Sequence, residues 1–407
     1  MCLLPQLPMR FHSRVQFLLC LVFLFTCFST RVEPVFGDAS KSFRVATFNT
    51  SLNRRNEGDL LEHMKLGSHP QIRFIAETIQ RIRPDVLLVN EFDYDTNHES
   101  LKLFQEKYLG VDQRGEQAIQ YPYTYSAAVN TGVASGLDLD GNGSKGPADA
   151  FGFGFFPGQY GMVVLSKYPI QQSKIRTFQT FLWRDMPKAE LPVKTDGTAY
   201  YSAEVLARFR LSSKSHWDVP IEVDGKVFHF LTCHPTPPVF DGSEDRNGCR
   251  NSDEIRFFAD YIVPSRSNYI YDDKKQKGGL AAGEQFVIAG DMNADPYDGE
   301  SRENPIRQLL KHERVNATAP KSEGAVEQTK KQGRVNADHH GDPAEDTADF
   351  NDAKIGNLRL DYVLPSDGFS IVSEGTFWPR GDDPAEELVH VSDHRLVWVD
   401  LRWKVSE

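Results

Sequence analysis

Residues 84–91 read Pro-Asp-Val-Leu-Leu-Val-Asn-Glu, an apolar run between a proline and an acidic residue. Four successive apolar residues without a charge predict a short strand that is buried on both faces. Before this run, isoleucines at 72, 75, 79 and 82 follow helical spacing, and Pro84 ends the pattern. A helix that leads directly into a buried strand is typical of an α/β protein.

Similar patterns extend along the chain in both directions. Further strands are expected at 43–48, 221–223, 227–231, 286–289, 360–364, 371–372 and 397–403. Asp224-Gly225 separates two of these strands and predicts a tight hairpin. Asn251, with Glu254 three residues later, predicts a capped helix start. Hairpins mixed with strand–helix units favour α/β layers with mixed or antiparallel sheets over one parallel sheet.

The chain of 407 residues is 40% apolar and carries a formal charge of −11. This composition excludes wholesale disorder and a disulfide-stapled miniprotein. Because duplex DNA is bound largely through Lys and Arg, the acidic balance also argues against a protein that coats DNA without sequence preference.

An export signal is predicted at the N-terminus. Arg10 and Arg14 precede an uncharged apolar run at 15–28, which is short for a membrane span and typical of a signal peptide. We expect residues 1–37 to be removed, with an uncleaved anchor as the alternative. Loss of three arginines and one glutamate would take the formal charge to −13. We therefore expect a secreted or periplasmic protein without a stable membrane span.

Residues 38–407 show neither a linker nor an internal repeat and are predicted to form a single domain. Two segments interrupt its pattern. One is a Gly-rich insertion at 131–158, and the other is a polar loop at 318–352 that we expect to be solvated and partly mobile. The pair His339-His340 in the polar loop has the chemistry of a metal ligand, but a solvated run is the simpler interpretation.

The insertion contains the spacing of a calcium loop. The oxygen-bearing residues at positions 1, 3, 5, 7 and 12 of such a loop are Asp138, Asp140, Asn142, Ser144 and Asp149. Asp in place of Glu at the last position and the lack of flanking amphipathic helices depart from the EF-hand pattern. Two interpretations stay open, a structural Ca²⁺ site and a Gly/Asp surface turn.

Cysteine usage agrees with export. Three of the five cysteines lie in the predicted signal, which leaves Cys233 and Cys249. An even pair in an oxidising compartment is compatible with a disulfide. Two buried free thiols are the alternative.

Polar residues stand at or just beyond several expected strands. They are Asn49, Glu91, His234, Asp291, Asn293, Asp361, Asp393 and His394. An Asp or Asn at a strand end is often only a turn former. As a set, however, these residues supply carboxylates for a hard cation, amides for orientation and two imidazoles for proton transfer.

These residues lie in motifs that resemble the endonuclease/exonuclease/phosphatase superfamily, which has the deoxyribonuclease I-like fold. The motifs are Thr47-Phe48-Asn49, the run at 84–91, Cys233-His234-Pro235, Gly290-Asp291-Met292-Asn293, Leu360-Asp361-Tyr362 and Ser392-Asp393-His394. Their order and spacing, over about residues 43–403, carry the resemblance. It implies an α/β four-layer sandwich, in which two packed mixed β-sheets are flanked by helices and the site lies at one edge.

The resemblance also implies roles for these residues. Glu91 would be the principal ligand of Mg²⁺ or Mn²⁺, with Asn49 beside it. Asp393 would complete the metal side or act through water.

The other five residues would act on the substrate. His394, held by Asp361, would take a proton from the attacking water. Asp291 and Asn293 would position that water and the phosphate, and His234 would contact phosphoryl oxygens.

Three functions follow from these observations. The first is a secreted, divalent-metal-dependent phosphoesterase that hydrolyses a phosphodiester or phosphomonoester. The second is a secreted endonuclease for DNA or RNA, and the third is a non-catalytic, Ca²⁺-dependent binding protein. The expected partner is a phosphoester substrate, either a small molecule, a lipid head group or a nucleic acid, and we expect a monomer.

Two segments bear on the choice of substrate. A basic and aromatic stretch at 176–194 has the composition of a nucleic-acid rim, or of a loop that covers a sheet edge. Phe151, Phe153, Phe155 and Phe156 have the composition of a membrane-contacting segment, although packing of the insertion onto the body is the favoured interpretation.

Overall fold

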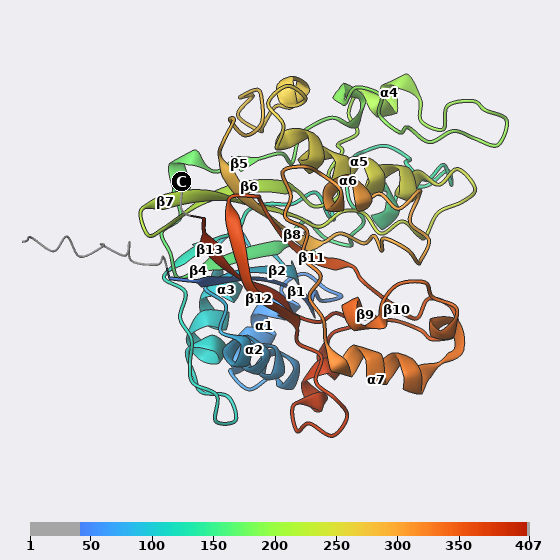
Figure 1. Cartoon of the computed structure of the whole chain (residues 1–407). Helices are drawn as coiled ribbons and strands as arrows, with labels where there is room; N and C mark the ends of the chain where they lie inside the picture. Colours follow the sequence, from blue (N-terminus) through green and yellow to red (C-terminus); the bar gives the residue numbers. More distant parts are fainter. Residues whose placement is uncertain (1–40, 405–407) are drawn as a thin grey trace, which may run out of the picture. The chain divides into compact units, whose positions relative to one another are not determined.

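Two mixed β-sheets form the centre of the structure, a computed structural model that describes residues 41–404 (Figure 1). The signal peptide predicted at 1–37 lies outside the described residues. The first sheet has the strand order β12-β13-β1-β2-β4-β3. Its strands are β1 (Phe43–Leu52), β2 (Val86–Phe92), β3 (Tyr123–Tyr125), β4 (Met162–Ser166), β12 (Phe369–Thr376) and β13 (Val397–Trp403). β1 and β2 are parallel, and the other neighbours are antiparallel.

The second sheet has the order β11-β8-β7-β6-β5. Its strands are β5 (Arg176–Thr177), β6 (His216–Val223), β7 (Lys226–Cys233), β8 (Gln285–Asp291) and β11 (Asp361–Pro365). Only β7 and β8 are parallel in this sheet. Asp224 and Gly225 join β6 to β7 with φ of 52° and 74°, as a two-residue hairpin turn requires. The hairpin prediction is confirmed.

Apolar side chains fill the space between the sheets. Val45 and Leu88 of the first sheet belong to the same buried cluster as Val219, Phe230 and Val287 of the second. Each sheet therefore buries one face against the other, at about 25 cal/mol for each Å² of apolar surface removed from water.

Helices cover the outer faces. α1 (Asp59–Leu66), α2 (Pro70–Ile82) and α3 (Glu99–Phe104) lie on the first sheet, and α5 (Arg246–Tyr261) lies on the second (Figure 1). Ile72, Ile75 and Ile79 of α2 pack in one buried cluster with Leu87 and Val89 of β2, as their helical spacing predicts. The four-layer α/β sandwich is thus confirmed.

Shorter elements complete the structure. The remaining α-helices of the described residues are α4 (Ala203–Leu206), α6 (Arg307–Leu310) and α7 (Glu323–Gln332), and β9 (Ala348–Asp349) pairs with β10 (Asn357–Leu358). α7 and β9 lie inside the segment predicted to be a solvated loop, so that prediction is wrong for much of 318–352. Ser322 caps α7 by accepting a hydrogen bond from the Ala325 backbone N–H, and Ala325 is buried with Trp378.

The predicted helix start at Asn251 is also wrong. α5 begins at Arg246, five residues earlier. Asn251 and Glu254 are buried inside the helix, where their side chains bind neighbouring loops rather than the helix end.

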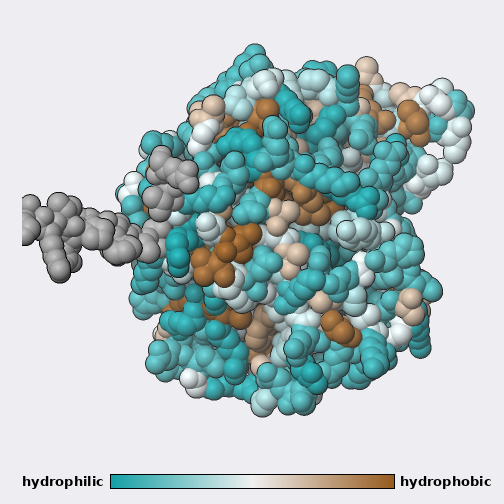
Figure 2. All heavy atoms as spheres, viewed as in Figure 1, coloured by the Kyte–Doolittle hydropathy of each residue, from teal (hydrophilic) through white to brown (hydrophobic). Residues whose placement is uncertain are grey.

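Among the described residues, no helix combines the length and the apolarity needed to cross a membrane. The face drawn in Figure 2 is mostly hydrophilic, and apolar residues are exposed there in small separate groups.

Candidate active site

Six strands bring the predicted site residues to one edge of the sandwich. The carboxyl ends of the parallel pairs β1–β2 and β7–β8 supply Asn49, Glu91, His234 and Asp291. β11 begins with Asp361 directly opposite Asp291, and Asp393-His394 precede β13. Because β11 and β13 are antiparallel to their neighbours, they begin where β8 and β1 end.

Backbone strain marks this edge. The register of β1 against β2 shifts after Asn49, and Glu91 and Asn293 adopt positive φ of 59° and 49°. Non-glycine residues rarely adopt this conformation, and it tends to gather at functional sites. Gly290 is needed for a different reason, because a Cβ there would lie 2.0 Å from the Cys233 carbonyl oxygen.

Asp291 lies at the centre of the cluster. Its Oδ2 accepts a hydrogen bond from Asn49 Nδ2 at 3.0 Å and lies 3.4 Å from His234 Nε2 and 3.5 Å from His394 Nε2. Its Oδ1 accepts a hydrogen bond from the Asn293 backbone N–H at 2.9 Å. One carboxylate thus links the predicted metal side to both imidazoles.

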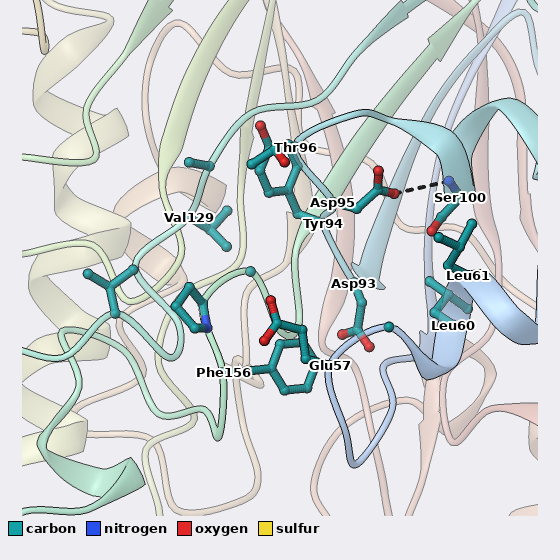
Figure 3. A pocket seen from close by; sticks show the side chains of 15 residues that line it. Glu57, Leu60, Leu61, Asp93, Tyr94, Asp95, Thr96, Ser100, Val129 and Phe156 are labelled. Carbon is teal, nitrogen blue, oxygen red and sulfur yellow. Dashed lines mark hydrogen bonds between the residues drawn. The ribbon is translucent and has the colours of Figure 1, made fainter.

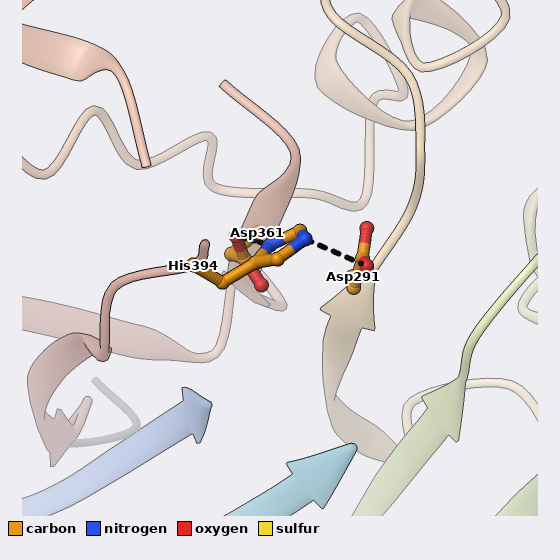
Figure 4. Close-up of side chains that lie close together, drawn as sticks. All are labelled: Asp291, Asp361 and His394. Carbon is orange, nitrogen blue, oxygen red and sulfur yellow. Dashed lines mark hydrogen bonds and ion pairs between the residues drawn. The ribbon is translucent and has the colours of Figure 1, made fainter. Parts of the chain in front are cut away.

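His394 is held by Asp361, as Figure 4 shows. The distance from His394 Nδ1 to Asp361 Oδ2 is 2.8 Å, and the Thr347 hydroxyl donates to the same oxygen at 2.8 Å. The Asp361 Oδ1 atom is buried and has no hydrogen-bond partner among the described residues. The carboxylate fixes the imidazole so that Nε2 points toward Asp291.

Glu91, Asn49 and Asp393 form the other side of the site. Asn49 Nδ2 donates to Glu91 Oε1 at 3.2 Å, and Asp393 Oδ1 accepts a hydrogen bond from the Ser51 hydroxyl at 3.0 Å. Burial, followed by the charge of Asp393, raises the pKa of Glu91 to about 7. The amide nitrogen of Asn49 faces the carboxylates here, so the amide would have to turn over for its oxygen to bind a cation.

A cavity of about 1020 Å³ opens onto these groups. Glu91, His234, Asp291, Asn293, Asp393 and His394 line it. Asn49 and Asp361 lie behind this lining and hold Glu91 and His394 through hydrogen bonds. The structure therefore brings all eight predicted residues together.

Lys214 is a site residue that the sequence did not reveal. It lies in the loop before β6, is 6% exposed and lines the cavity. Burial lowers the pKa of Lys214, and the nearby charges of Glu254, Glu91 and Asp291 oppose that effect. Burial of His234 and the charge of Lys214 hold the pKa of His234 well below 6.5.

Glu254 and Asn251 of α5 hold the loops around this lysine. Glu254 accepts hydrogen bonds from the backbone N–H groups of Ser213 at 2.6 Å and Thr236 at 2.7 Å. Asn251 Nδ2 donates to the Thr236 carbonyl at 2.8 Å. The only sequence signal was a set of polar residues on a helix face that would otherwise be apolar.

Of the two interpretations left open for the cysteine pair, the structure has the free thiols. Cys233 and Cys249 are both free and buried. The Cys233 Sγ lies 3.6 Å from the sulfur of Met292 in the core. Burial raises the pKa of Cys233 well above its usual value and that of Cys249 to about 11.

The Gly-rich loop gathers three of the five predicted calcium ligands. One oxygen each from Asp138, Asp140 and Asp149 lies within 4.8 Å of the others. Both Asp149 oxygens already accept backbone hydrogen bonds, from Leu139 at 2.6 Å and Gly146 at 2.7 Å. The loop satisfies its own carboxylates as a surface turn does, and the calcium site stays a prediction.

A second cavity, of about 350 Å³, contains none of the predicted site residues (Figure 3). Leu60, Val129 and Phe156 contribute to its wall. Asp93 also lines it, but its two oxygens accept backbone hydrogen bonds from Arg54 at 2.7 Å and Tyr160 at 3.1 Å. This carboxylate thus fastens two loops together.

The sequence model of the endonuclease/exonuclease/phosphatase family matches residues 46–394. The chain belongs to this family. It is therefore a metal-dependent hydrolase of phosphoester bonds, and the resemblance drawn from the motifs is confirmed. A comparison with curated proteins gives no match.

A comparison with solved structures finds several that are similar to this chain. An endonuclease/exonuclease/phosphatase from Beutenbergia cavernae is 18% identical, with a TM-score of 0.49, over 89% of this chain and 72% of its own. Sphingomyelinase C from Streptomyces griseocarneus is 17% identical, with a TM-score of 0.45, over 89% and 99%. A beta toxin mutant from Staphylococcus aureus with bound magnesium ions is 14% identical, with a TM-score of 0.42, over 89% and 100%.

The residues at this edge fit a divalent metal ion. The charge of Asp393 raises the pKa of Glu91, so the two carboxylates repel each other. A cation bound between carboxylates removes such repulsion. Carboxylate and amide oxygens are the ligands that hard cations prefer. Asp291, Asp361 and His394 also offer three atoms within 4.8 Å of one another, but two of these residues already bond to each other.

Proposed function

We propose that this chain is a secreted phosphoesterase that uses Mg²⁺ or Mn²⁺ to hydrolyse a phosphodiester or phosphomonoester. A water activated by His394 would attack phosphorus in line with the leaving oxygen. One observation carries the proposal: the Asp361–His394 pair, Asp291 and Glu91 meet at one edge of the sandwich, beside a single cavity.

The His394–Asp361 hydrogen bond sets the direction of proton transfer. With Nδ1 bound to Asp361, Nε2 is the nitrogen that is free to accept a proton on the cavity side. Asp291 Oδ2 lies 3.5 Å from Nε2 and is placed to orient the attacking water. The water oxygen bonds to phosphorus, its proton passes to Nε2, and the ester oxygen leaves.

The phosphoryl oxygens need positive charge and hydrogen-bond donors, because hydrolysis spreads negative charge over them. Lys214 and His234 line the cavity and supply such groups. Glu91 and Asp393, with Asn49 beside them, would hold the metal ion, which supplies further positive charge at the phosphoryl oxygens.

A substrate panel tests this proposal. The full chain is assayed with para-nitrophenyl phosphate, bis-para-nitrophenyl phosphate, plasmid DNA and RNA, first with EDTA and then with excess Mg²⁺ or Mn²⁺. We expect metal-dependent hydrolysis of at least one ester. Glu91→Gln should lower it by on the order of 100-fold or more, while Glu62→Gln, whose side chain is 68% exposed, should not. Equal rates with EDTA and with metal would contradict the proposal.

Export belongs to the same proposal and needs its own test. Supporting it are the apolar run at 15–28 after two arginines and the small residue Gly37. Mass spectrometry of the exported chain should give Asp38 as the first residue. A cell-associated protein that still carries residues 1–37 would contradict it.

A further inference from the structure

Apolar surface makes up most of the wall of the catalytic cavity, although polar residues also line it. Three segments contribute to this surface: the insertion with Ala148, Ala150 and Phe153, the loop after β7 with residues 237–240, and the stretch that contains Val335, Phe350 and Ile355. The insertion and the polar loop, which interrupt the sequence pattern, thus lie on the cavity wall. A volume of about 1020 Å³ is far more than a phosphate group fills.

This apolar wall begins at the catalytic imidazole. The ring of Phe350 lies edge-on to that of His394, with 5.8 Å between centroids and an interplanar angle of 84°. A phosphorus atom within reach of His394 therefore has its substituents next to Phe350. A group that the phosphate carries on this side lies beside the apolar wall.

Two aromatic side chains are exposed where they line the cavity. Phe153 is 53% exposed and Phe240 is 88% exposed. Phe240 also adopts a positive φ of 67°, which is rare for an aromatic residue. Large apolar side chains in water at a cavity wall mark a surface for an apolar ligand group.

Free positive charge is scarce in the same cavity. Of the four Lys and Arg residues that line it, Arg250 donates to the carbonyls of Leu211 and Phe151, and Arg246 pairs with Glu244. Lys214 lies among catalytic carboxylates. Lys354 is exposed and makes no ion pair with the described residues. One such surface cation is little for a polynucleotide groove, which neutralises several phosphates.

The basic stretch at 176–194 does not supply this charge either, because none of its residues lines the cavity. Arg176 pairs with Asp272 at 2.9 Å, and Phe181 and Trp183 are buried. Arg184, Lys188 and Lys194 are exposed, but they lie outside the residues that line the cavity.

Building on the proposed function, we infer that the site takes phosphodiesters in which one ester group is bulky and apolar. That group lies against Phe153, Phe240 and Phe350, while the phosphate faces His394. A lipid and an aromatic ester share this chemistry, and the test below separates them.

The test uses para-nitrophenyl phosphodiesters that differ only in the second ester group: methyl, octyl or naphthylmethyl. The leaving group is constant, so any difference in kcat/KM reports how the second group is bound. We expect the octyl or naphthylmethyl ester, as soluble monomers, to exceed the methyl ester by at least ~10-fold, mainly through KM. Preference for octyl indicates a lipid-like chain, and preference for naphthylmethyl an aromatic group.

Two variants test whether the apolar wall causes the preference for bulky esters. The double variant Phe153→Ala, Phe240→Ala should reduce the ratio to about 1–3. Ala148→Trp, which fills space at an exposed lining position, should also lower the bulky-ester rate selectively. Leu66→Ala, 63% exposed on α1 and outside the cavity lining, is the control and should behave as wild type.

The outcomes separate this inference from the proposed function. Hydrolysis of the methyl ester with no gain for bulky groups overturns the inference alone, as does a higher kcat/KM for plasmid DNA than for any apolar ester. Failure to hydrolyse any ester overturns the proposed function and the inference together.

Discussion

His394 Nδ1 lies 2.8 Å from Asp361 Oδ2, and both side chains are buried. Burial alone would lower the pKa of His394, but the charges of Asp361 and Asp291 outweigh it and raise that pKa well above 6.5. Burial also disfavours the charged form of Asp361, and it raises the pKa of that carboxyl to about 6 although His394 acts to lower it. The attraction between the two groups thus opposes the effect of burial on each, and their hydrogen bond fixes the imidazole.

Asp361→Asn should therefore lower kcat by about 100-fold or more without unfolding the protein, because it keeps the size of the side chain but loses its charge. The amide can also turn its NH₂ group toward Nδ1, which favours the wrong tautomer. Steady-state kinetics and thermal melting measure the two effects. A variant within twofold of wild-type kcat would show that Asp361 does not position His394.

Lys214→Met should lower kcat/KM for an anionic phosphodiester by about 10-fold to 1000-fold, because it removes a positive charge beside Glu91 and Asp291 while keeping most of the side-chain volume. Lys188→Met on the exposed surface is the matched control. Equal kcat/KM in the two variants would mean that Lys214 serves only the fold.

Gly290→Ala should destabilise the protein by ~1–3 kcal/mol, since the new methyl group would lie 2.0 Å from the Cys233 carbonyl oxygen, where β7 and β8 meet. Urea unfolding measures the change. Gly146→Ala has open space around its Cβ and should be nearly neutral. Similar unfolding midpoints for the two variants would argue against this close approach.

Stability should also depend on pH through Asp346, a buried carboxyl. Burial, then the charges of Asp295 and Asp298, raise its pKa to about 8 from an ordinary value of 3.8. Between these two values the unfolded chain releases the proton and the folded chain keeps it, so stability falls as pH rises from about 4 to 8.

Asp346→Asn removes this dependence. We expect its melting temperature, relative to wild type, to rise steadily between about pH 4 and 8. Asp382→Asn, at a side chain that is 81% exposed, should show no such trend. A constant difference across this range for Asp346→Asn would contradict the raised pKa.

The sequence predicts the framework of the site well, because local runs of apolar residues indicate the strands. Apolar runs locate the strand ends that carry Glu91 and Asp291, and turn chemistry locates Asp224-Gly225. Which strands become neighbours depends on sheet pairing between distant segments, and here the ordered motifs of the family supplied what local patterns could not.

The sequence did not predict the parts of the site and fold that depend on buried polar side chains. Lys214 stands in a polar run, and its place in the site depends on Glu254 of α5, 40 residues later. Asn251 and Glu254 match a capping pattern, but their side chains form hydrogen bonds with two neighbouring loops instead of the helix end. α7 has few apolar residues, so its composition did not indicate a helix, although Ser322 caps its N-terminus.

The most direct test of the account is the hydrolysis rate of bis-para-nitrophenyl phosphate by EDTA-stripped protein before and after addition of Mg²⁺, for wild type and His394→Asn. We predict that both stripped proteins are inactive, that Mg²⁺ restores the wild type, and that His394→Asn stays at least ~100-fold slower. Full activity of the stripped wild type, or recovery of His394→Asn to within twofold of it, would contradict the account.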